Sequence, residues 1–289
     1  MRINTNINSM RTQEYMRQNQ DKMNTSMNRL SSGKSINSAA DDAAGLAIAT
    51  RMRAKEGGLS VGARNTQDAM SALRTGDSAL GSISNILLRM RDLATQASSG
   101  TNNLTDSASL NKEYQQLATE IDHIAQKTNF NGNSFLNSNG DDKDPLKGPK
   151  GTDIKIQLSD TANDNLDIKA IDATTTALLG GAIGSLTHAT DPAAAITAAT
   201  AEMKKIDTAI QNVADARATF GSQLNRLDHN LNNVTSQATN MAAAASQIED
   251  ADMAKEMSNM TKFKILNEAG ISMLSQANQT PQMVSKLLQ

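Results

Sequence analysis

The chain has 289 residues, with no Cys, no Trp, two Tyr and four Phe. The absence of Cys excludes a disulfide scaffold and thiol catalysis, and a formal net charge of −2 with scattered basic residues argues against a nucleic-acid partner. Because aromatic side chains are scarce, any core has to consist of Leu, Ile, Met and Ala. No apolar run approaches the ~20 residues that span a bilayer, and the first residues lack the apolar stretch of a signal peptide. We therefore expect no membrane insertion and no cleaved signal.

Residues 1–32 predict a first helix, with apolar residues such as Ile3, Ile7 and Met10 at helical spacing. The segment is also rich in Asn, Gln, Ser and Met, a composition that makes a poor isolated helix. We expect it to become ordered only against a partner surface.

A segment rich in Ser, Ala and Asp follows at 33–58. Adjacent positions on a helix point about 100° apart, so Asp41 and Asp42 do not converge on one ion. They are expected to cap a helix or to form ion pairs. The basic residues available for such pairs are Lys34, Arg51 and Arg53.

The most regular pattern lies in 59–136. Its apolar and small residues alternate three and four positions apart, at Leu59, Gly62, Thr66, Ala69, Leu73, Gly76, Leu80, Ile83, Leu87, Met90, Ala94 and Ala97. This heptad seam predicts a helix of about 40 residues. SSGTNN (98–103) ends it, and a second seam follows at Leu110, Tyr114, Leu117, Ile121 and Ile124. The short break favours an antiparallel neighbour.

The pattern changes in the short middle of the chain, 137–193, which we expect to be surface-exposed. Phe130-Asn131-Gly132, just before it, contains the Asn-Gly pair typical of a tight turn. Apolar residues then alternate with polar ones at Ile154, Ile156 and Leu158 and again at Leu166 and Ile168, which predicts short hairpin strands.

Two helical segments complete the chain. Residues 194–250 carry a third heptad seam, at Leu224, Leu227, Leu231, Val234, Ala238, Met241, Ala245 and Ile248. Residues 251–289 are again Met-rich, with apolar positions that include Met257, Met260, Leu274, Leu287 and Leu288. These residues and the N-terminal segment find no seam in their own chain except each other, so packing between copies is plausible.

The combined patterns predict a mainly α fold: an elongated antiparallel coiled-coil-like helical bundle with a small β-hairpin region in the middle of the chain. The sequence gives no catalytic constellation. His123, His188 and His229 have no metal-ligand spacing, and the glycine-rich stretches lack the Lys of a phosphate loop. We predict no enzyme activity, no cofactor and no metal.

Several stretches carry a specific family pattern. They are RINTNINSM (2–10), LSSGKSINSAADDAAGLAIATRMRA (30–54), NTQDAMSALRTGDSAL (65–80), TNFNGNSFL (128–136), ARATFGSQLNRLDHNLNNV (216–234) and IEDADMAKEMSNMTKFKILNEAGISMLSQANQTPQMVSKLL (248–288). Together they resemble bacterial flagellin, over roughly residues 1–136 and 194–289.

The resemblance implies a structural subunit that polymerises with itself into the flagellar filament. In that family 1–32 and 251–289 are paired inner-core helices, 33–58 connects them to a rod domain formed by 59–136 and 194–250, and 137–193 faces outwards. Residues expected to pack between subunits are Ile3, Ile7, Met10, Gly33, Asp41, Asp42, Gly45, Met257, Met260, Leu274, Leu287 and Leu288.

The resemblance also implies partners and a location. Family members are exported unfolded by the flagellar type III system and are therefore secreted, to form an extracellular filament. They bind a secretion chaperone through the C-terminal region, here about 250–289, and meet a filament cap and hook-associated proteins. A host Toll-like receptor recognises many of them, and the matching positions here are Arg89, Leu93 and Glu113.

Two other interpretations remain open from the sequence. A hook-associated junction protein shares the terminal patterns, and a soluble coiled-coil adaptor would use the same seams to bind partner helices. Deleting the terminal segments distinguishes an adaptor from a filament subunit, because the adaptor keeps its function whereas the filament subunit stops polymerising.

Overall fold

The computed structural model describes residues 6–137, 153–186 and 192–287, which form two compact units. Unit 1 comprises Met1–Gly57 with Ala238–Gln289, and unit 2 comprises Gly58–Gln237. The helices are α1 (Ile7–Ser32), α2 (Ala43–Ala97), α3 (Leu104–Lys127), α4 (Thr175–Leu178), α5 (Pro192–Glu249) and α6 (Met253–Leu287). The strands are β1 (Asn129–Phe130), β2 (Asn133–Ser134), β3 (Ile154–Gln157) and β4 (Asn165–Ile168).

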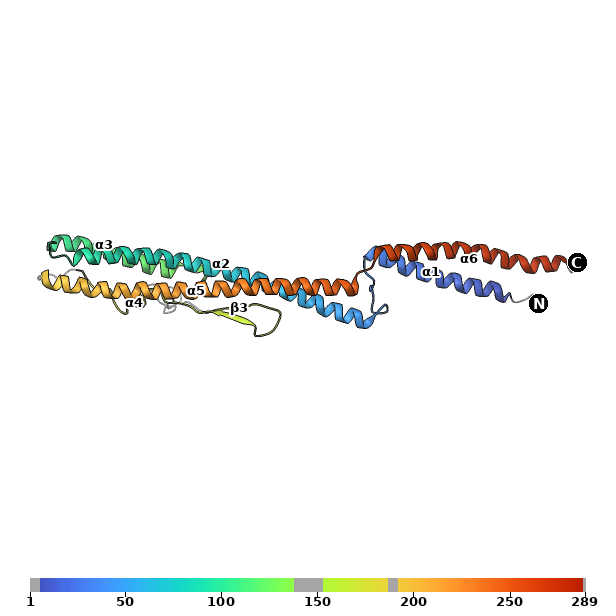
Figure 1. Cartoon of the computed structure of the whole chain (residues 1–289), viewed down its shortest axis with the longest axis horizontal. Helices are drawn as coiled ribbons and strands as arrows, with labels where there is room; N and C mark the ends of the chain where they lie inside the picture. The colour runs from blue at the N-terminus through green and yellow to red at the C-terminus, as the bar shows by residue number, and fades with distance from the viewer. Residues whose placement is uncertain (1–5, 138–152, 187–191, 288–289) are drawn as a thin grey trace. The chain divides into compact units, whose positions relative to one another are not determined.

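Unit 2 is an antiparallel helical bundle of α3 with the adjoining parts of α2 and α5 (Figure 1). The direction follows from two ion pairs between α2 and α5, Asp77 with Arg217 at 2.8 Å and Arg91 with Asp207 at 2.6 Å. As the residue numbers rise along α2, those of its partners fall along α5. The predicted mainly α bundle is confirmed.

The core of unit 2 follows the predicted heptads. All twelve residues of the seam between 59 and 97 are buried. The seam predicted in α3 is confirmed only in part, because Ala118 and Ala125 are buried while Leu117 and Ile124 are partly buried beside them. The helix α5 begins at Pro192, two residues before the predicted start, since proline fits the first turn of a helix. Its predicted seam is confirmed only in part, because Leu227, Val234 and Ala245 are buried while the other five positions are partly buried.

A polar contact between α3 and α5 lies inside this core. The buried Tyr114 hydroxyl donates a hydrogen bond to Glu202 Oε2 at 3.1 Å, and Lys205 Nζ lies 2.7 Å from Glu202 Oε1. Burial, followed by the negative charge of Glu202, raises the pKa of the Tyr114 hydroxyl well above its usual value. The hydroxyl therefore keeps its proton and remains a donor.

The predicted hairpins are present. β1 pairs with β2 across Asn131-Gly132, where both residues have positive φ as this turn requires. β3 pairs antiparallel with β4, with Ile156 opposite Leu166. The second hairpin lies against α2, since Asn65 Nδ2 donates to Gln157 O at 3.2 Å.

In unit 1, α1 and α6 lie side by side (Figure 1). The helix that the seam predicts from residue 59 already begins at Ala43, so most of the 33–58 segment is helical. Asp42 Oδ1 accepts hydrogen bonds from the backbone N–H groups of Ala44 and Gly45, both at 3.0 Å, and this N-terminal cap explains the early start.

Within the described residues, no helix combines the length and apolar character needed to cross a membrane. Across the same residues, no three His, Asp or Glu side chains gather closely enough to hold a metal ion.

Candidate interaction surface on the terminal helices

The helices α1 and α6 run antiparallel, and polar, small and partly buried apolar side chains such as Met16 lie between them. Asn6 Nδ2 donates to the Ala277 carbonyl at 2.9 Å, and Asn267 Nδ2 donates to Gln20 Oε1 at 2.6 Å. Between these two contacts the helices come close at Gly270, where an added Cβ would lie 2.7 Å from Met16 Cγ. The register therefore depends on hydrogen bonds and one close approach.

This contact buries little apolar surface. Ser26 is the buried residue of α1, and Glu256 is the buried residue among the described side chains of α6. No Ile, Leu, Met or Phe of either helix is fully buried in the part that the structure describes. Because burial of apolar side chains provides most of the stability of packed helices, the pair is weakly stabilised within one copy.

Most of the large apolar side chains of the two helices are exposed instead. Of the thirteen large apolar residues that the described structure exposes, ten belong to α1 and α6. They are Ile7, Met10, Tyr15, Met27, Met253, Met257, Ile265, Leu266, Ile271 and Met273. We call these ten residues the outer apolar surface. So many exposed apolar residues on two adjacent helices mark a protein interaction surface.

One ion pair between the two helices is incomplete. Arg29 Nη1 lies 3.6 Å from Glu256 Oε1, beyond hydrogen-bond distance. Arg29 Nε and Glu256 Oε2 are buried without a hydrogen-bond partner. Buried polar atoms normally find a partner, so this end of the pair is not fully satisfied by contacts within the copy.

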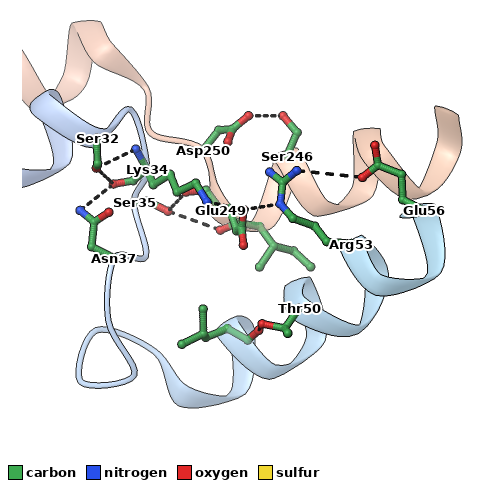
Figure 2. Close-up of polar contacts among 12 residues, drawn as sticks. Ser32, Lys34, Ser35, Asn37, Thr50, Arg53, Glu56, Ser246, Glu249 and Asp250 are labelled. Carbon is green, nitrogen blue, oxygen red and sulfur yellow. Dashed lines mark hydrogen bonds and ion pairs between the residues drawn. The ribbon is translucent and has the colours of Figure 1, made fainter. Parts of the chain in front are cut away.

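A second polar cluster joins the segment that follows α1 to the segment that precedes α6. Arg53 Nε and Lys34 Nζ lie 2.8 Å and 3.2 Å from the same carboxylate oxygen of the buried Glu249 (Figure 2). The backbone N–H of Ser35 donates to Glu249 O at 2.6 Å, and the N–H of Ala251 donates to Gly33 O at 2.9 Å. We call this arrangement of residues 33–35, Arg53 and 249–251 the Glu249 clasp.

The electrostatics of the clasp favour a charged Glu249. The hydrogen bond from Arg53 lowers the pKa of the Glu249 carboxyl; burial opposes this effect, and Lys34 adds to it. The same hydrogen bond, with the charge of Glu249, raises the pKa of Arg53. The cluster is therefore a charge-assisted contact between chain segments about 200 residues apart in sequence, as in the 196-residue separation of Arg53 and Glu249.

The predicted packing residues near the clasp have local roles. Gly33 ends α1 in the left-handed conformation, with φ 71°, which few side chains tolerate. Asp41 accepts hydrogen bonds from the N–H groups of Ser38 at 2.9 Å and Asn37 at 3.1 Å, and these lower its pKa. Gly45 is buried beside Asp42. Of the two roles expected for Asp41 and Asp42, the structure shows capping for Asp42 alone, because Asp41 binds the turn that precedes it. Lys34 and Arg53, expected as ion-pair partners, pair with Glu249 instead.

The remaining predicted packing residues lie on the terminal helices. Ile7, Met10 and Met257 belong to the outer apolar surface, and Met260 and Leu274 are partly buried. Ile3, Leu288 and the Leu287 side chain lie outside the described residues.

The three positions matched to receptor recognition lie in unit 2. Arg89 Nη2 on α2 and Glu113 Oε1 on α3 form an exposed ion pair at 2.8 Å. Leu93 is only 1% exposed. Its side chain packs in the core of the bundle and is not part of the surface that the folded unit offers to a partner.

Two residues of this site, Glu249 and Glu256, do not emerge from the sequence pattern. Both occur in the polar stretch IEDADMAKEM, where an acidic residue is normally solvent-exposed. Glu249 does follow the heptad position Ile248 directly, and this adjacency is the one local sign that it is close to a packed face.

Two family models match the chain. The model for the bacterial flagellin N-terminal helical region matches residues 3–141, and the model for the C-terminal helical region matches residues 203–288. The chain belongs to the bacterial flagellin family. The curated flagellin of Listeria monocytogenes is 44% identical over 293 residues, covering 100% of this chain and 99% of the relative. Flagellin of Bacillus subtilis is 40% identical over 303 residues, covering 100% of both chains.

Solved structures agree with this assignment. The crystal structure of Bacillus cereus flagellin is 65% identical, with a TM-score of 0.50, and the match covers 63% of this chain and 94% of that one. A putative flagellar hook-associated protein from Vibrio parahaemolyticus has a TM-score of 0.58 at 15% identity, covering 73% of this chain and 100% of that one. The second likeness concerns the fold alone.

These matches favour the filament subunit among the interpretations that the sequence left open. The sequence identity is to flagellins, so the hook-associated alternative has less support. Flagellins are structural proteins, and this chain is a subunit of the bacterial flagellar filament.

Proposed function

We propose that copies of this chain polymerise by burying the outer apolar surface of α1 and α6 against neighbouring copies. The observation that carries the proposal is the exposure of ten large apolar side chains on two helices that fully bury no Ile, Leu, Met or Phe among their described residues. A fully buried Ile, Leu or Met contributes about 1.5–3 kcal/mol. Contacts between copies thus supply the stabilisation that the helix pair lacks.

In this proposal the terminal helices are ordered by assembly. In an isolated copy, α1 and α6 are held together by a few hydrogen bonds and little apolar burial. Ordering each backbone residue costs about 1–2 kcal/mol of conformational entropy. Neighbouring copies shift that balance. The helices therefore fray in a free subunit and become stable in the polymer.

The Glu249 clasp provides a fixed starting point for this ordering. It holds residue 34 beside residue 250, and these are the connections from which α1 and α6 depart. Because the starts of the two free segments are held together, fewer conformations have to be lost when the helices pair.

We propose the remaining partners by analogy with the family. The subunit is exported unfolded through the flagellar type III system, and a chain without Cys passes it without forming disulfides. A secretion chaperone binds residues 250–289 and covers part of the outer apolar surface before export. The secreted subunit then adds beneath a filament cap, above the hook-associated proteins.

Recognition by a host Toll-like receptor uses unit 2. Arg89 and Glu113 offer an exposed charge pair on the α2–α3 face. Leu93 is buried in the core of the bundle and contributes indirectly, by packing the helices that carry Arg89 and Glu113.

Seeded assembly tests the central proposal. The double variant Ile265→Asn and Ile271→Asn removes two exposed apolar side chains of α6, and the matched control Lys264→Gln with Glu268→Gln changes two exposed polar ones. We expect the first variant to raise the critical concentration for growth on filament fragments by about 100-fold or more. The control stays close to the unmodified chain.

Thermal unfolding of unit 2 shows whether either variant disturbs the fold. Both are expected to unfold like the unmodified chain, because the changed side chains are exposed and belong to unit 1. Growth of the Ile265→Asn, Ile271→Asn variant at the unmodified critical concentration would exclude this surface from assembly.

A further inference from the structure

The exposed methionines are concentrated in the terminal helices. The side chains of Met10 and Met27 on α1 are 61% and 52% exposed, and those of Met253, Met257 and Met273 on α6 are 48%, 55% and 65% exposed. In unit 2, by contrast, Met90 is 0% exposed, and Met70 and Met203 are partly buried against the core. Every strongly exposed methionine that the structure describes therefore belongs to the outer apolar surface.

The register of the helix pair divides these five residues into two groups. Met253 and Met257 are four residues apart, so they share one face of α6. They lie near the Arg29–Glu256 contact, as does Met27 on α1. Met10 and Met273 both lie between the Asn6–Ala277 contact and the Met16–Gly270 contact. Methionine sulfur is thus present toward both ends of the surface.

We propose that Met10, Met27, Met253, Met257 and Met273 are oxidation sites that control whether a free copy can assemble. The inference rests on the proposed assembly through the outer apolar surface. The oxidant is a hydroperoxide such as hydrogen peroxide. The thioether sulfur attacks one oxygen of hydrogen peroxide, and the O–O bond breaks as the S–O bond forms. The departing hydroxide takes the proton from the oxygen now bonded to sulfur and leaves as water. Sulfur loses two electrons, and peroxide gains them.

The product is incompatible with the proposed contact. A sulfoxide replaces a flexible apolar side chain by a polar one that needs hydrogen-bond partners. Burying such a group against the apolar side chains of a neighbouring copy leaves it unpaired, which is unfavourable. Oxidation of a free copy therefore blocks its addition, whereas copies already assembled keep these sulfurs covered.

The composition of the chain makes methionine the target. The chain contains no Cys, so no thiol competes for the oxidant. Methionine sulfoxide is also reversible by the two stereospecific sulfoxide reductases. Oxidation and reduction can consequently switch the assembly of an existing copy off and on again, without synthesis of a new chain.

Peptide mass spectrometry of the full-length chain after timed exposure to hydrogen peroxide tests where the oxygen enters. We expect the five exposed methionines to be oxidised about tenfold faster than Met90, because access to solvent controls the reaction. Equal rates at Met90 and at the five sites would overturn the inference. This measurement needs no polymer, so it stands apart from the proposed function.

Seeded assembly of the same samples tests the consequence. Peroxide should lower the growth rate of the unmodified chain by about tenfold or more, and treatment with both sulfoxide reductases should restore it. A treated chain that grows at its untreated rate overturns the inference but leaves the assembly proposal intact. An untreated chain that fails to grow on seeds overturns both.

Two variants assign the effect to these residues. Each is judged by the ratio of its own growth rates after and before peroxide, whatever its starting rate. The variant M10L/M27L/M253L/M257L/M273L should keep a ratio near unity, and the unit 2 control M70L/M203L should lose growth like the unmodified chain. If the fivefold variant itself does not grow, rescue of the unmodified chain by the reductases decides the question, and failure of that rescue overturns the inference.

Discussion

At the scale of single residues, Glu249 is the most constrained charged group of unit 1. Its carboxylate contacts Arg53 and Lys34, and its carbonyl accepts a hydrogen bond from Ser35. A hydrogen bond to a charged group stabilises the folded chain more than a neutral one does. Removing one partner of a buried hydrogen bond also leaves the other unpaired, which lowers stability further. The side chain therefore stabilises the backbone bridge beside it.

Replacing Glu249 by Gln should loosen that bridge. The neutral amide keeps the shape but loses the charge, so we expect the free energy of opening at the amides of Ser35 and Ala251 to fall by about 1–3 kcal/mol. Amide hydrogen exchange of the free chain measures this directly. Glu56→Gln is the control, since Glu56 lies 4.0 Å from Arg53 and is expected to change the opening energy by less than about 0.5 kcal/mol. Equal effects of the two variants would contradict the assigned role.

The free energy of opening at the amides of Ser35 and Ala251 should depend on pH. The pKa of Glu249 is lowered in the folded chain, so its stabilisation is complete above the ordinary Glu value of about 4.3 and is lost as the pH falls through the lower folded value. We expect the difference in opening energy between the unmodified chain and Glu249→Gln to shrink as the pH drops below about 4. A difference that stays constant down to pH values of about 2 would contradict this reading.

Sequence alone could not identify this residue as a contact. The patterns around Arg53 and Glu249 are those of exposed helical charges, and the two residues are 196 positions apart. Periodicity predicts which face of a helix is buried, but it carries no information about which distant charge meets which. Asp42 was more accessible to prediction, because capping is a local interaction within a few residues.

At the scale of elements, the sequence predicted α2 better than α1. The α2 seam alternates apolar and small residues without a break, and all twelve positions are buried. In α1 the apolar residues do not form one stripe, and the face toward α6 includes Asn6, Met16 and Ser26. When some apolar residues of a helix face α6 and others face a neighbouring copy, the apolar positions do not follow a single helical period.

Packing within unit 2 yields a prediction at Gly76 of α2. A Cβ at this position would lie 2.5 Å from the Phe135 ring and 2.8 Å from the Phe220 ring, so neither ring can stay in place. We expect Gly76→Ala to lower the free energy of unfolding of unit 2 by about 1–3 kcal/mol, through overpacking. Chemical denaturation followed by circular dichroism measures the change.

Gly221 of α5 provides the matched control. A Cβ there meets no atom within 4 Å, and alanine is the better helix former, so Gly221→Ala should raise the free energy of unfolding by about 0.5–1 kcal/mol. If both glycine variants stabilised unit 2, the close contact of α2 with the two phenylalanine rings would have to be rejected.

At the scale of the whole molecule, the two units differ in how they are stabilised. Unit 2 contains a continuous apolar core that includes Leu73, Leu87, Ile121 and Phe220. The helix pair of unit 1 exposes ten large apolar side chains, and the residues that it fully buries in the described part are the polar Ser26 and Glu256. Unit 2 is therefore stabilised within one copy, whereas the helix pair of unit 1 lacks a buried apolar core of its own. This difference suits a protein whose terminal helices become rigid only in a polymer.

Hydrogen exchange on free and assembled copies tests this account most directly. In free copies we predict that the amides of α1 and α6 exchange at least about 1,000-fold faster than those of α2 between Leu73 and Ala94. In filaments the amides of α1 and α6 should slow by about 100-fold or more, while those of α2 change little. Terminal helices that are as well protected in the free copy as in the filament would contradict the claim that neighbouring copies complete them.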